Sequence, residues 1–247
     1  SNRLWRRNNM KLLLMIADID EFVPFKKCVE RRITEEFIFR GMPAFKFSHK
    51  GIEVTALCFG IGKVNAATGA ALALSELKFD GVINTGWSGA VSGVAKGDVI
   101  VATSFVECDF DMTAIGKLPA QKPGQDIYVY NACGFIYDAV VKANEKAADS
   151  HAKFKFGALG TGDIFLSDKK LAQYYKETFG IKAFDMESAA VASVCRVMNT
   201  PLLCARKISD SANDAAPSDY RESLFSDENA NVFYDIVFKV LGALCEP

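Results

Sequence analysis

The stretch Ala183–Val197, AFDMESAAVASVCRV, places two acidic residues where a short apolar strand passes into a helix of small residues. Strands are depleted in acids, and a buried carboxylate is costly unless something pairs with it or uses it. Asp185 and Glu187 therefore either complement the N-terminus of the helix, where the helix dipole favours an acid, or they belong to a site. The motif alone leaves both interpretations open.

The segments on both sides of this stretch alternate between apolar strands and helices. The patterns predict strands at residues 10–17, 80–86, 97–107, 155–162, 181–186 and 201–209, with two or three more within 37–60. They predict helices at residues 22–32, 63–77, 135–149, 169–179, 188–198 and 229–244, and a long loop at 108–125. This alternation predicts an α/β fold in three layers, with a mixed, mostly parallel sheet flanked by helices.

Length and charge narrow the class of protein. The 247 residues carry a formal net charge of −1, and half of them are hydrophobic. These values fit one large domain, here residues 10–247, and give no reason to expect a nucleic acid as partner. No apolar run reaches the roughly 18 residues of a membrane span. Residues 1–9 are basic and precede no signal-peptide pattern, so we expect them to be a disordered extension or a vector-derived remnant.

The cysteines and histidines point to a compartment and argue against a metal. Seven cysteines occur without a CxxC pair, several of them in apolar runs, which is typical of buried thiols in the reducing cytosol. With only two histidines and no cysteine cluster, no metal site is expected.

Polar residues follow several of the predicted strands. They lie at residues 18–21, 85–89, 162–165, 185–187 and 209–210. Ligands of such sheets bind beyond the carboxyl ends of the strands, so we expect these residues to meet in one site. The glycine-rich turn GIGKVNAA at 60–67 matches neither common phosphate-binding motif: Asn65 stands at the third glycine of the Rossmann fingerprint, and Val64 follows Lys63 where the P-loop needs Ser or Thr.

Five motifs occur together in a fixed order. They are GIGKVNAA, INTGWSGA, GTGDIFL, FDMESAAVA and RKISDSAND. The set resembles the nucleoside phosphorylase/nucleosidase superfamily, and most of all the 5′-methylthioadenosine/S-adenosylhomocysteine nucleosidases, over nearly the whole chain from residue 10. The resemblance implies a twisted sheet that is partly closed into a barrel, usually in a homodimer. It also implies hydrolysis of the N-glycosidic bond to adenine in these nucleosides, and in 5′-deoxyadenosine or adenosine, by water and without a cofactor.

Three acids match the catalytic residues of that family. Cleavage of a purine–ribose bond builds positive charge on the sugar and negative charge on the base, so the base must be protonated and the sugar cation stabilised. The resemblance implies that Asp210 donates a proton to purine N7 and that Glu187 binds the ribose hydroxyls. It implies that Glu21 activates the water, with Arg206 helping to hold Glu21 and the water. Asp185 is predicted to be structural.

The resemblance also implies a set of substrate contacts. Phe165 is expected to stack on adenine, backbone groups near Leu166 to contact the edge of the base, and Met186 to lie under the ribose. The remaining predicted substrate-binding residues are Ile61, Met112 and Tyr220 around the 5′ substituent, Ser209 beside the general acid, and Trp87 and Asp18. The loop DMTAIGKLPAQKPG at 111–124 is expected to close the partner subunit's pocket in a homodimer.

Two positions, Trp87 and Asp18, depart from the family pattern, while the rest of the pocket around the 5′ substituent, Tyr220 included, keeps the family's character. Trp87 replaces a small residue and is expected to narrow the space around the sugar. Asp18 stands where the family is apolar, near the 5′ substituent, and Tyr220 stands where the family usually has Phe. We expect Asp18 to accept a hydrogen bond from a polar 5′ group, unless it turns away and pairs with a Lys or Arg.

The nucleophile is predicted to be water. Phosphorylases of this superfamily carry a GDPxR-like loop after the first strand and often an Arg before the central glycine-rich turn. Here those places read ADIDEF and Asn84, and the acids would repel phosphate. Three alternatives stay open: a nucleosidase for another 5′-modified nucleoside such as a futalosine-type hydrolase, a purine nucleoside phosphorylase, and a binding protein in which Trp87 blocks water.

Overall fold

The computed structural model describes residues 10–125, 128–148, 153–213, 215–225 and 229–246, so the predicted extension at 1–9 lies outside the described residues. The strands are β1 (Lys11–Ile16), β2 (Ile33–Phe39), β3 (Met42–His49), β4 (Ile52–Cys58), β5 (Gly81–Ala90), β6 (Val99–Glu107), β7 (Val129–Asn131), β8 (Lys155–Thr161), β9 (Ala183–Asp185) and β10 (Leu202–Asp210). The α-helices are α2 (Ile19–Val29), α3 (Lys63–Glu76), α4 (Phe135–Lys146), α5 (Lys169–Phe179), α6 (Ser188–Val197), α7 (Ala216–Phe225) and α8 (Asn229–Cys245), with short 3-10 turns η1 (Glu30–Arg32) and η2 (Thr113–Ile115).

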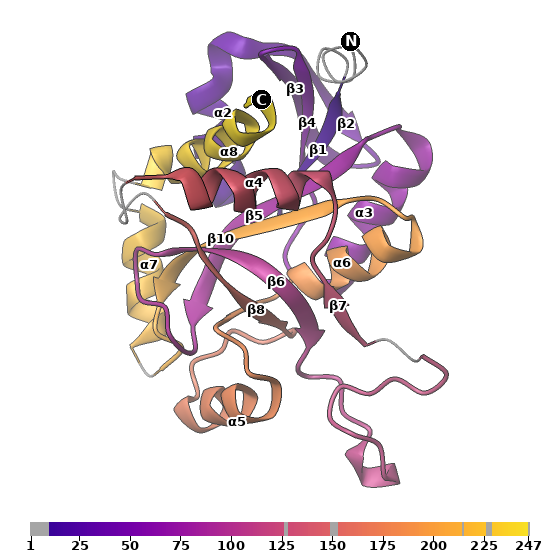
Figure 1. Ribbon diagram of the computed structural model, residues 1–247, viewed down its shortest axis with the longest axis vertical. Coiled ribbons are helices and arrows are strands. Elements are labelled where there is room, and N and C mark those ends of the chain that lie inside the picture. The colour runs from indigo at the N-terminus through magenta and orange to yellow at the C-terminus, as the bar shows by residue number, and fades with distance from the viewer. Residues whose placement is uncertain (1–9, 126–127, 149–152, 214, 226–228, 247) are drawn as a thin grey trace.

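The strands form one mixed sheet whose central part closes on itself. The order along the sheet is β10-β6-β8-β9-β5-β1-β4-β3-β2, and β10 also pairs with β5 in parallel. That extra pairing makes a ring of β5, β10, β6, β8 and β9, which is the partly closed barrel that the resemblance implied. The strands β1, β4, β3 and β2 extend from β5 as an open wing (Figure 1). Antiparallel pairs are more frequent than we predicted, because the meander β2-β3-β4 and the barrel pairs β10–β6 and β5–β9 add to them.

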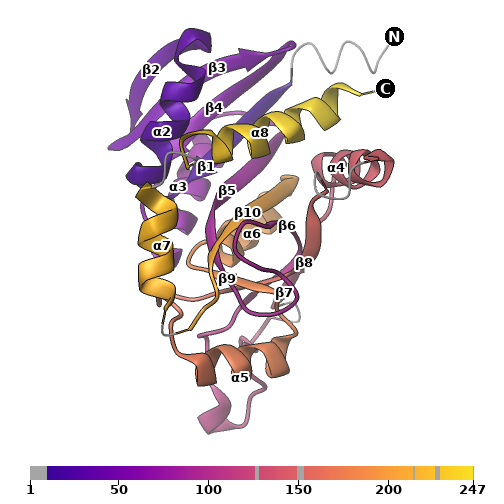
Figure 2. The ribbon, with the colours of Figure 1, turned by 90° about the vertical axis from the view of Figure 1, so that its left-hand side faces the viewer.

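Helices cover both faces of the open wing. Within β1, Leu12, Leu14 and Ile16 pack into a core with α2 and α8, whereas Leu13 and Met15 pack into a second core with α3 and α6. Alternate side chains of a strand point to opposite faces, so a strand buried on both faces must be apolar throughout. The result is the predicted three-layer arrangement: in Figure 1 the strands of the wing lie between α2 and α8 on one side and α3 on the other, and in Figure 2 α2 and α8 face the viewer.

Two elements were not predicted, α7 in polar sequence and β7, which is only three residues long. Helix α7 follows β10 and packs against it, and the short strand β7 pairs with β6. The segment between β6 and β7 was predicted as a long loop. It leaves the body of the molecule and carries the turn η2 at its far end (Figures 1 and 2).

Candidate active site

A cavity of about 270 Å³ opens at the carboxyl ends of β1, β5, β8, β9 and β10. Residues of β5, β9 and β10 line its wall, as do residues that directly follow β1 and β8, and α2 and α7 contribute others. The predicted site residues that line it are Asp18, Glu21, Ile61, Trp87, Phe165, Leu166, Met186, Glu187, Arg206, Ser209, Asp210 and Tyr220. The fold therefore brings together residues that lie up to two hundred positions apart in the chain.

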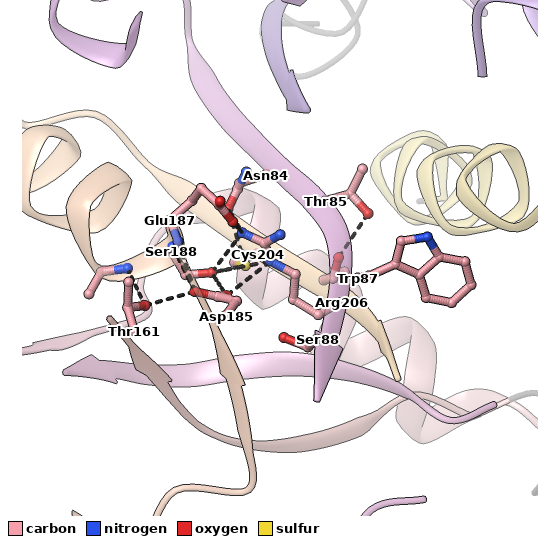
Figure 3. Close-up of polar contacts among 12 residues, drawn as sticks. Asn84, Thr85, Trp87, Ser88, Thr161, Asp185, Glu187, Ser188, Cys204 and Arg206 are labelled. Atoms are coloured by element: carbon pink, nitrogen blue, oxygen red, sulfur yellow. Dashed lines mark hydrogen bonds and ion pairs between the residues drawn. The ribbon is translucent and has the colours of Figure 1, made fainter. Parts of the chain in front are cut away.

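Arg206 is at the centre of a buried polar cluster, drawn in Figure 3. Its Nε lies 3.1 Å from Oδ2 of Asp185, and its Nη2 lies 3.6 Å from Oε2 of Glu187. Nη2 also donates to Oδ1 of Asn84 at 2.8 Å and to Oγ of Ser188 at 3.1 Å. A buried guanidinium is tolerated only with such partners, so these contacts fix Arg206 in one position beneath the cavity.

Asp185 is held through both of its carboxylate oxygens. Its Oδ1 accepts hydrogen bonds from Oγ1 of Thr161 at 2.8 Å, from the Ser188 amide at 3.0 Å and from the Glu187 amide at 3.1 Å. Its Oδ2 accepts a hydrogen bond from the Ser188 hydroxyl and faces Arg206. Asp185 thus satisfies the first amides of α6 and anchors the guanidinium, which supports its predicted structural role.

Glu187 lies between the start of α3 and Arg206. Its Oε1 accepts the backbone N–H of Gly62 at 3.1 Å, and its Oε2 faces the guanidinium. Burial raises the pKa of Glu187 to about 7, although Arg206 and the Gly62 amide act in the opposite direction. The carboxylate lines the cavity wall, so it can face a cationic sugar.

Glu21 is buried beside the same guanidinium. Its Oε1 accepts the backbone N–H of Trp87 at 3.1 Å, and its Oε2 has no hydrogen-bond partner in the described part of the chain. Burial raises the pKa of Glu21 to about 8, with the positive charge of Arg206 as the largest opposing influence. We predicted that Arg206 holds Glu21, but the direct ion pairs of Arg206 within the described residues are with Asp185 and Glu187.

Gly86 makes this close arrangement of charges possible. Its φ of +152° is one that other residues rarely adopt, and a Cβ built there would lie 2.5 Å from Nη1 of Arg206 and 3.0 Å from Oε2 of Glu21. Any side chain at position 86 would therefore push Glu21 and the Arg206 guanidinium out of their present positions. The motif INTGWSGA does not by itself reveal why its first glycine, Gly86, is required.

Asp210 ends β10 on the other side of the cavity. Its Oδ2 accepts the hydroxyl of Ser209 at 2.6 Å, and its Oδ1 accepts the amide of Ala212 at 2.9 Å. Asp210 is 3% exposed, and burial raises its pKa above the ordinary value against these two hydrogen bonds. A carboxyl group with a raised pKa is suited to donate a proton near neutral pH.

Two predicted residues lie differently from what we expected. The backbone of Trp87 reaches Glu21, but its indole turns toward α8 and packs edge-on against Phe233, with ring centroids 5.4 Å apart (Figure 3). Most of the Trp87 side chain therefore packs into the hydrophobic core with Phe233, although the residue still lines part of the cavity. Met112 does not line the cavity of its own chain, since the loop that carries it leads away from the body.

The sequence matches a protein-family model over most of its length. The model of the Phosphorylase superfamily matches residues 11–241. The chain belongs to the phosphorylase superfamily. Its fold, with the partly closed barrel and flanking helices, is the one shared by the superfamily's solved nucleosidases.

The curated relatives and most of the similar solved structures are named 5′-methylthioadenosine/S-adenosylhomocysteine nucleosidases. The 5′-methylthioadenosine/S-adenosylhomocysteine nucleosidase of Marinomonas sp. (strain MWYL1) is 32% identical over 93% of this chain and 99% of that protein. The enzyme of that name from S. pneumoniae, solved with the transition-state inhibitor MT-ImmA, is 27% identical, with a TM-score of 0.84 over 95% of this chain and 100% of that one. Futalosine hydrolase of Helicobacter pylori is 22% identical, with a TM-score of 0.85 over 94% of this chain and 97% of that one, which shows a shared fold.

A further group of charged residues in this phosphorylase-superfamily chain, Lys63, Asp109 and Asp163, was not predicted from the sequence. Nζ of Lys63 lies 2.7 Å from Oδ1 of Asp109, and the Lys63 amide donates to Oδ1 of Asp163 at 2.8 Å. Oδ2 of Asp109 in turn accepts the Asp163 amide at 2.9 Å. The three residues join the start of α3, the end of β6 and the loop after β8, so they fix the turn that presents the Gly62 amide to Glu187. Lys63 and Asp163 were visible in the quoted motifs GIGKVNAA and GTGDIFL.

The described residues contain no group of three or more His, Cys, Asp or Glu side chains placed to hold a metal ion. None of the helices in the described part of this phosphorylase-superfamily chain has the length and apolar character to cross a membrane.

Proposed function

We propose that this chain is a nucleosidase that hydrolyses the N-glycosidic bond of 5′-methylthioadenosine and S-adenosylhomocysteine, releasing adenine and the corresponding ribose product. The observation that carries the proposal is the meeting of Glu21, Glu187 and Asp210 in one cavity, the first two beside the buried Arg206. The names of the similar proteins, which cover nearly the whole chain, support the same activity.

The chemistry divides between the two sides of the cavity. As the bond between the anomeric carbon and N9 breaks, its electron pair goes to the base, and Asp210 donates a proton to N7 so that adenine leaves neutral. Glu187 carries negative charge toward the oxocarbenium-like sugar and binds its hydroxyls. Water adds its oxygen to the anomeric carbon and gives a proton to the fraction of Glu21 that is ionised near neutral pH, given its pKa of about 8. Ser209 positions Asp210 through the 2.6 Å hydrogen bond between them.

The charges around the cavity favour water over phosphate. Five acids line it, namely Asp18, Glu21, Asp185, Glu187 and Asp210, and Arg206 is the one cationic side chain among the described lining residues. The guanidinium is already committed to Asp185, Glu187 and neutral partners. A phosphate dianion would have to displace these contacts and meet the remaining carboxylates.

A homodimer completes the proposal. The loop at 111–124 carries Ile115 and Leu118, which are 66% and 61% exposed. On the body, Ile61 and Val64 at the start of α3 are 48% and 76% exposed, and Ile61 also borders the cavity. The loop of one subunit, with Met112, covers the open 5′ end of the other subunit's cavity. Light scattering that gave a monomer mass at micromolar concentration would refute this arrangement.

We propose the cytosol as the compartment, because four of the seven cysteines, all free thiols, are buried in the core.

The proposed activity is tested by incubating the purified chain with a panel of purine nucleosides and following free adenine by chromatography. Adenine release from methylthioadenosine supports the proposal, and an inert chain refutes it. If a base is released only from other nucleosides, the chain is a nucleosidase for another class of substrate.

A further inference from the structure

The 5′ end of the cavity holds a polar pair that the family pattern lacks. The hydroxyl of Tyr220, on α7, donates to Oδ2 of Asp18 at 3.4 Å, at the start of α2. Both side chains line the cavity. The family usually has apolar residues at both places, so this chain has replaced an apolar wall by a carboxylate and a phenol.

The fold holds each member of the pair independently of any ligand. Asp18 is the N-cap of α2, and its Oδ1 accepts the amide of Asp20 at 3.0 Å. This capping bond keeps the carboxylate at the cavity, with Oδ2 directed to Tyr220. The ring of Tyr220 packs edge-on against Phe165, with centroids 5.5 Å apart. Asp18 and Tyr220 therefore approach the same place from two elements.

Asp18 is not neutralised by a neighbouring cation. The alternative, in which Asp18 turns away and pairs with Lys or Arg, is not found, because the described residues contain no ion pair to Asp18. Its side chain instead accepts hydrogen bonds from the Asp20 amide and from the Tyr220 hydroxyl. The nearest charged groups that act on Tyr220 are acids, namely Glu21, Asp18 and Glu187, and with burial they raise the pKa of its hydroxyl. The phenol thus stays protonated and the surroundings stay acidic.

We propose that the Asp18–Tyr220 pair selects for an uncharged, hydrogen-bonding 5′ substituent, with the 5′-hydroxyl of adenosine as its simplest case. This inference rests on the proposed nucleosidase function and concerns its substrate range. A 5′-hydroxyl donates to the Asp18 carboxylate and accepts from the Tyr220 phenol. An alkylthio group at that place removes water from both groups and returns no hydrogen bond, which costs binding. An anionic 5′ tail is repelled by the carboxylate.

The physical size of the effect sets the expected selectivity. Loss of one matched polar partner in a binding pocket changes selectivity by roughly 10- to 200-fold. We therefore expect kcat/KM for adenosine to lie within about tenfold of that for methylthioadenosine in the wild-type chain, since the gained hydrogen bonds offset the lost apolar contact.

The test measures the ratio of kcat/KM for adenosine to that for methylthioadenosine in matched variants. Tyr220→Phe removes only the hydroxyl and keeps the ring against Phe165, and Asp18→Asn keeps an N-cap residue while removing the charge. Both should lower the ratio by about tenfold or more. Tyr174→Phe and Asp168→Asn are the controls: Tyr174 is an exposed tyrosine outside this cavity, and Asp168 caps α5 as Asp18 caps α2. The controls should leave the ratio unchanged.

The outcomes separate the two proposals. If both nucleosides release adenine but the ratio is the same in wild type, Tyr220→Phe and Asp18→Asn, the selectivity inference is wrong and the proposed function stands. If the wild-type ratio is below about one in a thousand, which exceeds the effect of a single polar partner, the inference is also wrong. If no nucleoside releases adenine, the proposed function fails and the selectivity inference fails with it.

Discussion

Nε of Arg206 lies 3.1 Å from Oδ2 of Asp185, and both side chains are 1% exposed. Of the two acids in the motif FDMES, Asp185 pairs with Arg206, and Glu187, two residues later, is the acid that we propose to face the sugar. Asp185 neutralises much of the guanidinium charge and holds the start of α6, which leaves the carboxylate of Glu187 at the cavity wall.

The first prediction concerns the stability that this pair provides. Asp185→Asn removes the carboxylate and leaves Arg206 buried with less compensation, which costs about 3–5 kcal/mol for a buried pair broken on one side. Urea unfolding of wild type and variant measures this loss. Asp168→Asn, at the exposed cap of α5, is the control and should change stability by less than about 1 kcal/mol. An Asp185→Asn variant as stable as wild type would show that the pair does not anchor the site.

The second prediction concerns the proton donor. Asp210→Asn should lower kcat for adenine release by about 10²–10⁴-fold, the usual worth of a positioned general acid. Substrate affinity should change little, because the proton is needed only in the transition state. Ser209→Ala removes the 2.6 Å hydrogen bond that lowers the pKa of Asp210. The basic limb of the pH–rate profile should therefore move to higher pH. A fully active Asp210→Asn variant would remove Asp210 from the mechanism.

The third prediction concerns Gly86. A methyl group there would collide with Nη1 of Arg206 and press on Oε2 of Glu21. Gly86→Ala should therefore lower kcat by at least about tenfold, since displacements of about 1 Å at a reacting centre cost up to roughly 100-fold. The control is Gly242→Ala in α8, where an added Cβ meets nothing within 4 Å. Equal losses in both variants would contradict a specific role for Gly86.

The fourth prediction concerns pH and stability. Glu21 has an ordinary pKa of 4.5 in the unfolded chain and about 8 in the folded one. Between these pH values the folded chain keeps a proton that the unfolded chain releases, so this residue makes the free energy of unfolding fall as pH rises from about 4.5 to about 8. Each unit of pKa difference corresponds to about 1.4 kcal/mol, so the change amounts to a few kcal/mol.

Glu21→Gln tests that dependence. The variant has no carboxyl to ionise, so its stability relative to wild type should increase by a few kcal/mol between pH 5 and pH 8. Urea unfolding at several pH values measures the difference, which cancels the contributions of all other groups that titrate alike in both proteins. A difference that is constant across this range would mean that Glu21 is ionised in the folded chain already at pH 5.

Much of the fold could be predicted from the sequence because its elements carry strong local patterns. Helix α5 was predicted with its bounds, and β1, α3 and β10 to within one or two residues. Helix α7 was missed because the first turn of APSDYRESLF holds Pro217, Ser218 and Asp219, residue types that are also typical of turns. The role of α7 in the site depends on tertiary packing, which places Tyr220 over the cavity.

The sequence predicted which residues belong to the site better than it predicted how their side chains are arranged. The acids could be found because each follows a strand, and parallel strands end at the same edge. The direction of Trp87 could not be found, because β5 is buried on both faces and period-two alternation then gives no polar side to distinguish them. Likewise, Met112 lies in a loop whose path depends on neither periodicity nor local propensity.

We propose that Glu21, Glu187 and Asp210 together make water, and not phosphate, the nucleophile that attacks the anomeric carbon. The purified chain should be incubated with methylthioadenosine in buffers with and without phosphate, and the sugar product identified by its mass. We predict adenine release at the same rate in both buffers, with free methylthioribose as the sugar product. Adenine release that requires phosphate and yields methylthioribose 1-phosphate would contradict the account.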